Sequence, residues 1–443
     1  MARKSVILKE LPKLVGEGII KQDAADAIRA YYEKKDVPQS SMLLIAFGVM
    51  GAVLVGGGII LLLAHNWDDL SRVLRTVLSL TPLAVAQSLC GYALVKRNES
   101  IAWREATAAF IVLSIGTAIA LISQTYNIYG NLGRFLLTWS LLALPVFYIM
   151  NASFSAVLYL IGIASWTGYQ AFDMDYPYLF WPLCAAAAPY FFYMYKNFNQ
   201  TIRFQLLTWA TLIFFYISIE FLLMPWRTYL HGSWFSLPGY SLLAYGAYYS
   251  LIFLIGRGRH YDDKSLFSNP FLVIGSLAIP VMVLIYTFES SWKHIEEFSH
   301  TSIAQFSVPI WMSTVMVAML LAAALALLII RIRQKQYTVI PMGIGFLVAS
   351  AGYALLNAGI SVDLNLVLFN LYLLFIGVFT VVQGVRESRL VVINFGMLIL
   401  ASQIISRFFD SNLSFVLRGI IFIIFGIGFL LVNILIVKKR KSI

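Results

Sequence analysis

A long series of apolar segments, each about the length of a membrane-spanning helix, dominates the chain. A helix needs roughly 20 mostly apolar residues to cross the hydrocarbon core of a bilayer. Segments of this kind lie at 42–64, 74–95, 105–123, 133–149, 151–171, 177–194, 203–223, 238–256, 270–287, 308–331, 339–357, 365–384, 390–406 and 417–437. The sequence therefore predicts about 14 transmembrane helices.

The composition agrees with a chain that folds inside a membrane. Hydrophobic residues make up 60% and charged residues 12% of its 443 residues, whereas a soluble globular domain has roughly 45–50% apolar and about 25% charged residues. Disordered chains are poorer still in apolar side chains. We therefore expect an all-α, polytopic integral membrane helical bundle, and we exclude a soluble or disordered protein.

The first 41 residues are polar or amphipathic and differ from the rest of the chain. Leu11 and Leu14 lie on one face of a predicted helix, and Asp23 is placed to cap a second one. This pattern predicts a short helical hairpin in the cytoplasm. The expected parts of the chain are the hairpin at 1–41, a transmembrane domain at 42–437 and a basic tail at 438–443.

The distribution of basic residues indicates the orientation. If the N-terminus is cytoplasmic, the cytoplasmic segments hold 25 of the 32 Lys and Arg residues and the outer loops hold 7. Loops rich in Lys and Arg stay on the cytoplasmic side of a membrane. We therefore expect both termini in the cytoplasm. The net charge of +11 then reflects topology, and we expect no nucleic-acid partner.

The sequence offers little for metal or cofactor chemistry. Cys90 and Cys184 both lie within apolar segments, and neither has a partner at metal-ligand spacing. The six-residue spacing of His294 and His300 does not place them on one helical face. No phosphate-binding or dinucleotide-binding glycine motif is present. We expect no metal, no cofactor and no catalytic residue.

Polar and aromatic residues gather in the segments that we predict to face outward, where they could line a cavity. Aromatic rings pack against the apolar surface of a ligand, while amides and carboxylates bind its hydroxyl groups. Such a cavity suits a small polar or lipid-linked solute. The candidate ligand-binding residues are Asn66, Asp68, Gln124, Tyr126, Asn127, Glu220, Arg407, Asp410 and Arg418.

The same residues also fit a simpler interpretation, in which they form an aromatic belt and helix caps. Asp68 or Asp69 could cap the second span and pair with Arg72. Glu220 lies close to the apolar end of its span at Met224, so its carboxylate could extend to the interface. An acidic group within a span otherwise points to a substrate or proton site.

Several of these motifs resemble a known family. Gly18-Ile-Ile20, Asn66-Trp67-Asp68 and Gln124-Thr-Tyr126-Asn127-Ile128 are similar to segments of the bacterial membrane proteins grouped as domain of unknown function 2157, as is Arg407-Phe-Phe-Asp410 followed by Arg418. The resemblance is strongest over about 1–150 and again over 400–440. Where the family often has histidine, this chain has Asn127. The resemblance implies a multi-span protein of the bacterial cytoplasmic membrane and brings no established activity with it.

Three functions are consistent with these features, and membrane lipids are expected partners in each. The first is transport or flipping of a small or lipid-linked solute through the outward-facing cavity. The second is an envelope structural or assembly role, in which residues 1–41 dock a cytoplasmic partner or another copy of the chain. The third is an enzyme that uses Asp68 and Asp69 on a lipid-linked glycan. The short loop that carries these acids disfavours it, so we favour a protein that is not an enzyme.

Overall fold

The computed structural model describes residues 11–12, 14–26, 67–173, 177–199, 201–223, 238–258, 268–299 and 310–408, together with Val416, Gly419, Ile423, Gly426 and Ile427. These residues form helices and the turns that connect them, and strands are absent from this described part. The chain divides into two compact units, residues 1–77 and 78–443.

The first unit contains two short helical pieces separated by a left-handed turn. Gly18 has a φ of +69°, and the N–H of Ile19 donates to the carbonyl of Leu14 at 3.0 Å, which ends the first piece. The second piece begins at Gln22. The prediction that Asp23 caps it is therefore wrong: Asp23 lies in its first turn, where a carboxylate still interacts favourably with the helix dipole. The complete hairpin over 1–41 stays a prediction because much of it lies outside the described residues.

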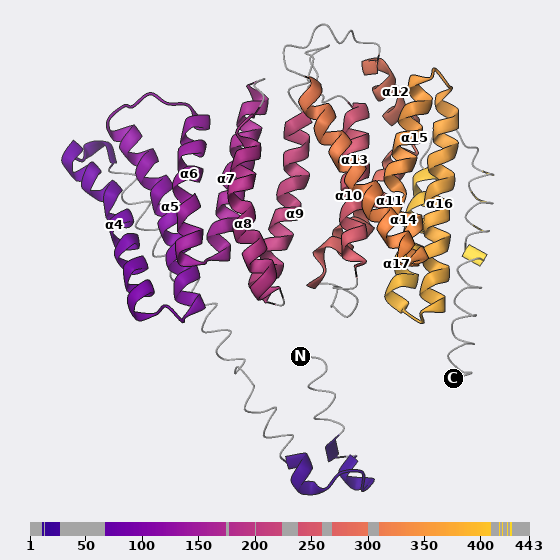
Figure 1. Ribbon diagram of the computed structural model, residues 1–443, viewed down its shortest axis with the longest axis horizontal. Coiled ribbons are helices and arrows are strands. Elements are labelled where there is room, and N and C mark those ends of the chain that lie inside the picture. The colour runs from indigo at the N-terminus through magenta and orange to yellow at the C-terminus, as the bar shows by residue number, and fades with distance from the viewer. Residues whose placement is uncertain are drawn as a thin grey trace. The chain divides into compact units, whose positions relative to one another are not determined.

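The remaining helices begin with a short 3-10 helix, and Figure 1 shows that the long helices from α5 onward run alternately in opposite directions. In chain order they are η1 (Trp67–Asp69), α4 (Arg72–Lys96), α5 (Ile101–Thr125), α6 (Leu132–Met150), α7 (Ser153–Phe172), α8 (Phe180–Phe198), α9 (Ile202–Leu223), α10 (Pro238–Gly256), α11 (Pro270–Ile285), α12 (Glu289–Ser299), α13 (Ile310–Arg333), η6 (Tyr337–Val339), α14 (Ile340–Gly343), α15 (Gly345–Asn357), α16 (Val362–Arg386) and α17 (Leu390–Phe408).

Nine helices within the described residues are long and apolar enough to cross a membrane, or up to ten if α11 and α12, which are bent by 78°, form one broken span. The prediction of a polytopic helical membrane protein is confirmed. Helices also occupy the predicted segments 151–171 and 177–194, but α7 and α8 are not among the nine. Polar residues such as Ser and Gln in α7, and Tyr, Lys and Asn in α8, lower their hydropathy. The segment 42–64 and most of 417–437 lie outside the described residues, so the count of 14 stays a prediction.

Two groups of buried side chains hold the larger unit together. One is built from α5 to α10 with α13 and includes the fully buried Phe147 and Phe180. The other extends from α10 to α17 and includes the fully buried Phe346 and Phe369. Helices α10 and α13 contribute to both groups, so they join the two halves of this unit.

Close approach of α10 and α11 depends on a glycine. A Cβ atom at Gly275 would lie 2.6 Å from the backbone nitrogen of Phe253, closer than any side chain allows. Lipid supplies no hydrophobic force between helices, so small residues that permit backbone contact stabilise such pairs. Gly275 therefore sets the distance between the central helix α10 and its neighbour.

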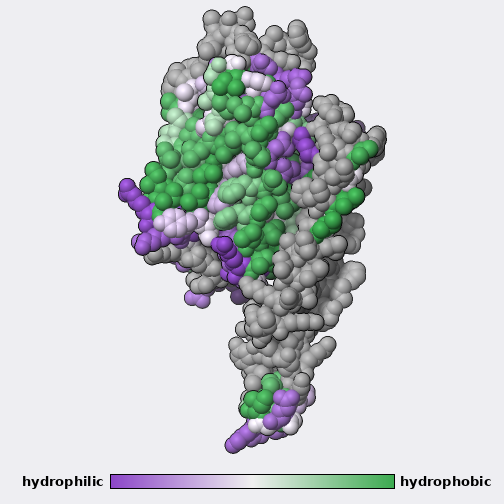
Figure 2. All heavy atoms as spheres, turned by 90° about the vertical axis from the view of Figure 1, so that its right-hand side faces the viewer, coloured by the Kyte–Doolittle hydropathy of each residue, from purple (hydrophilic) through white to green (hydrophobic). Residues whose placement is uncertain are grey.

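The two ends of the larger unit differ in charge. We call the end where α5 begins the Glu105 end, at the bottom of Figure 1, and the opposite end the Glu220 end. Figure 2 shows a broad hydrophobic area on one face, with hydrophilic residues mainly toward its edges. Several helices finish at the Glu105 end with basic residues in their last turn. These are Lys96, Lys196, Arg331, Arg333 and Arg386.

Candidate functional site

Glu220 lies in a cluster of tyrosines between α9 and α10. The hydroxyl of Tyr245 is 3.2 Å from Oε2 of Glu220 and 3.3 Å from the carbonyl oxygen of Tyr216. The ring centroids of Tyr216, Tyr245 and Tyr249 are 5.5 to 6.3 Å apart. We call these four residues the Glu220 cluster.

Helix geometry explains why this cluster forms. Tyr216 and Glu220 are four residues apart on α9, and Tyr245 and Tyr249 are four apart on α10, so each pair shares one face of its helix. The Tyr245 hydroxyl stabilises the carboxylate by donating a hydrogen bond to it. Glu220 is only half-buried and lies three residues before the last described residue of α9. A carboxylate at this position can accept hydrogen bonds from a ligand as well as from Tyr245.

Arg407 on α17 binds the connection between α11 and α12. Its Nη2 atom donates to the carbonyl oxygen of Thr287 at 3.0 Å and to the Thr287 hydroxyl at 2.9 Å. Its guanidinium carbon lies 4.7 Å from the centre of the Phe288 ring. Because Thr287 lies where the chain bends by 78°, these contacts give Arg407 a positioning role at the bend.

The Glu220 cluster and Arg407 belong to one region of the protein. Glu220 interacts electrostatically with Tyr286, which directly precedes Thr287. The indole N–H of the fully buried Trp292 on α12 donates to the carbonyl of Tyr286 at 2.8 Å. Helix α12 is thereby anchored over the bend, beside the Glu220 cluster.

Three other predicted residues lie at the end of α5, and all three are exposed. The N–H of Asn127 donates to the carbonyl of Gln124, and Asn127 has a φ of +50° in the turn that follows the helix. Tyr126 is the C-cap residue and is 51% exposed. Figure 1 shows α6, α7 and α8 between α5 and α9. One cavity lined jointly by these residues and Glu220 stays a prediction.

The remaining predicted residues are described in part or not at all. The backbone of Asp68 lies in η1, before α4. The hydroxyl of Ser71 accepts a hydrogen bond from the N–H of Leu74 at 3.3 Å, so Ser71 takes the capping position that we predicted for Asp68 or Asp69. The candidates Asn66, Asp410 and Arg418 lie outside the described residues.

An apolar groove lies beside the Glu220 cluster, and it was not predicted from the sequence. Its volume is about 560 Å³, and helices α6 to α11 and α13 contribute to its lining. Phe191 and Cys184 of α8, Phe215 of α9, Ile252 of α10 and Met319 of α13 are among the lining residues. No single segment shows this feature in the sequence, because the groove depends on how seven helices pack.

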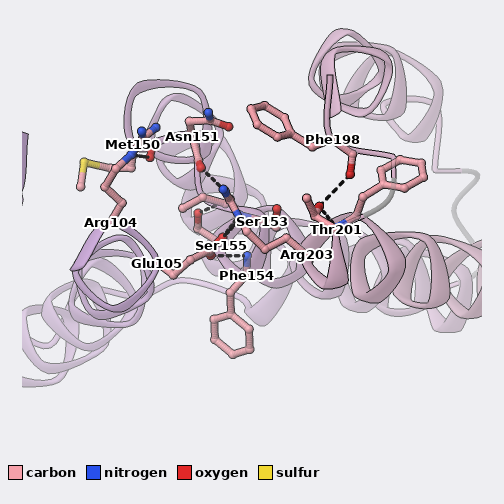
Figure 3. Close-up of polar contacts among 12 residues, drawn as sticks. Arg104, Glu105, Met150, Asn151, Ser153, Phe154, Ser155, Phe198, Thr201 and Arg203 are labelled. Carbon is pink, nitrogen blue, oxygen red and sulfur yellow. Dashed lines mark hydrogen bonds and ion pairs between the residues drawn. The ribbon is translucent and has the colours of Figure 1, made fainter. Parts of the chain in front are cut away.

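A charged network at the Glu105 end was also missed. Figure 3 shows how α5 and α9 meet the turn between α6 and α7 there. The Glu105 carboxylate accepts hydrogen bonds from the N–H groups of Ser153 and Phe154, both at 2.8 Å. Nε of Arg203 donates to Oε1 of Glu105 at 2.6 Å, and Nη2 of Arg203 donates to the carbonyl of Asn151.

This network caps two helices at once. The residue at the N-cap of α7, Ala152, has no side chain that could accept a hydrogen bond, so Glu105 on another helix binds the free N–H groups. Nε of Arg104 donates to the carbonyl of Met150 at 2.6 Å, and Arg203 binds the next carbonyl, so two cations neutralise the C-terminus of α6. The arrangement is structural. It joins α5, α6, α7 and α9 at one end, and the last three of these helices also line the groove.

Comparison with known proteins finds a family match over the N-terminal third of the chain. No curated protein and no solved structure matches the chain. The family match ends at residue 156, so it includes α5, α6 and the start of α7 but not the region at 400–440. Over residues 12–156 the chain matches the family described as predicted membrane protein DUF2157, which confirms the family that its N-terminal motifs resemble.

Proposed function

We propose that this protein transports or flips a lipid-linked solute across the membrane. The observation that carries this proposal is the position of two unlike binding surfaces on helix α9. One face of α9 bears Glu220 and Tyr216 in the tyrosine cluster. Other residues of the same helix, from Leu207 to Leu222, line the apolar groove.

A lipid-linked solute has a polar group attached to a hydrocarbon chain, and the two surfaces suit its two parts. Hydroxyl and carboxylate groups bind the polar part through hydrogen bonds, and apolar side chains hold the chain. The basic residues of the Glu105 end support its placement in the cytoplasm. The Glu220 end then faces outward in a bacterial cytoplasmic membrane, with both termini inside.

The test is translocation of a fluorescent polyprenyl-phosphate-linked sugar in proteoliposomes, measured by chemical quenching of the outer leaflet. We expect the quencher to reach nearly all of the probe in vesicles with the wild-type protein, because probe from the inner leaflet moves to the outer one. Glu220→Gln should slow the process by roughly tenfold or more, since hydrogen bonds to charged groups contribute about 1.5–3 kcal/mol.

Glu289→Gln is the matched control, because Glu289 lies on α12 and pairs with Lys293 at the surface. It should leave the rate unchanged. The proposal fails if the wild-type protein leaves the probe in its original leaflet, or if both glutamine variants behave like the wild type.

A further inference from the structure

The apolar groove is longer than one leaflet of a membrane. Along α9 its lining extends from Leu207 to Leu222, which corresponds to about 22 Å at 1.5 Å per residue. Half of a typical hydrocarbon core is roughly 15 Å thick. A ligand that fills the groove therefore extends beyond the middle of the bilayer.

The lining offers almost nothing to a polar ligand. The hydroxyls of Thr208 and Thr211 donate to carbonyls of their own helix at 2.8 and 2.7 Å. Ser218 is fully buried in the lining, and its Oγ has no hydrogen-bond partner among the described residues. Along most of its length the groove is thus suited to a hydrocarbon, with one hydroxyl left to bind a polar atom.

The volume of the groove matches that of a single lipid chain. A volume of about 560 Å³ lies within the usual range of roughly 300–1,000 Å³ for small-molecule sites. A site of this volume, lined by apolar side chains over about 22 Å of α9, fits one extended lipid chain.

Two arginines lie beyond the groove at the Glu105 end. Ile255 of α10 belongs to the lining, and Arg257 follows it by two residues. On α13, Arg331 lies two turns beyond the lining residue Ala323, and its Nε donates to the carbonyl of Leu254 at 3.1 Å. Both guanidinium groups therefore lie near the C-terminus of α10, where they attract an anionic headgroup.

We propose that the groove holds the hydrocarbon chain of an anionic lipid, with its phosphate near Arg257 and Arg331. This inference rests on the proposed function, because such a lipid is the carrier part of the solute. The Glu105 end is then the loading position, and the groove guides the chain while the polar part moves toward the Glu220 cluster.

The test uses phosphatidylglycerol with a photoreactive diazirine in one acyl chain, incorporated into nanodiscs with the full-length protein. Labelled peptides are mapped by mass spectrometry. We expect label on the groove residues of α8, α9 and α13. Ala188→Trp and Ala323→Trp, which fill the groove, should reduce this label at least fivefold, equivalent to about 1 kcal/mol of binding free energy.

Matched controls lie on the same helices. Ala185 and Ala322 are exposed but are not part of the lining, so Ala185→Trp and Ala322→Trp should retain the label. Arg257→Gln should lower the preference for phosphatidylglycerol over phosphatidylcholine by roughly fivefold, since a basic residue near an anionic surface contributes about 1 kcal/mol. Arg257→Lys should restore that preference.

Label that spreads evenly over all lipid-facing helices, or that persists in both groove-filling variants, would overturn the inference. Equal labelling by phosphatidylcholine in the wild-type protein would also contradict it. Photolabelling requires no translocation. A protein that labels without moving the fluorescent probe refutes only the proposed function, and one that moves the probe without groove label refutes only this inference.

Discussion

The network around Glu105 gives the sharpest prediction about stability. Replacing Glu105 by alanine removes the acceptor for two N–H groups at the start of α7 and leaves Arg203 without its carboxylate partner. The side chains of Arg203 and Glu105 are only 18% and 20% exposed. The variant therefore leaves a largely buried charge unpaired.

The expected loss follows from these contacts. Removing one partner of a buried ion pair costs about 3–5 kcal/mol, and loss of an N-cap acceptor costs roughly 0.5–2 kcal/mol. Some water reaches a pair with this exposure, so we expect a total of about 3–4 kcal/mol. Glu105→Gln keeps one acceptor oxygen and should lose less than the alanine variant.

The measurement is a double-mutant cycle with Arg203→Met, in which the free energy of unfolding is followed in mixed micelles. We expect the double variant to lose less stability than the sum of the two single variants, with a coupling of at least about 1 kcal/mol. A loss below about 0.5 kcal/mol for Glu105→Ala, typical of a surface substitution, would refute this reasoning. Additive single losses would refute it as well.

Two further predictions concern helix packing. Gly275→Leu should force α11 away from Phe253 and lower the free energy of unfolding by about 1–3 kcal/mol, measured by thermal unfolding in detergent. Gly275→Ala should have a smaller effect. A Gly275→Leu variant as stable as the wild type would contradict the close approach of α10 and α11. Arg407→Gln should release the α11–α12 bend and speed amide hydrogen exchange in 289–296. Exchange in α6 should be unaffected and serves as the reference. Protection of 289–296 equal to that in the wild type would show that Thr287 needs no partner on α17.

The sequence predicted the membrane helices well because the bilayer imposes one length and one kind of side chain on every span. The rule weakens where polar residues lie inside the protein. Helix α7 buries Ser155 and Thr167, whose hydroxyls bind backbone carbonyls. Such residues lower the hydropathy of a helix without exposing a polar group to lipid.

Sequence reasoning could select a site residue only where that residue is unusual for its own segment. Glu220 attracted attention as an acid in an apolar segment, and the structure adds its partner Tyr245. Glu105 and Arg203 resembled ordinary charges at the ends of two spans, because they are 98 residues apart in the chain and only helix packing joins them. The apolar groove escaped prediction for the same reason, since each lining residue alone is an ordinary membrane residue.

The most direct test of the central claim is native mass spectrometry of the protein in nanodiscs drawn from the membrane in which it is made. The account predicts a bound lipid that carries a phosphate and a polar solute, retained by the wild-type protein and reduced in the Glu220→Gln variant. Bulk phospholipids in the proportions of the surrounding membrane, with a second protein held through residues 1–41, would contradict the account and favour an assembly role.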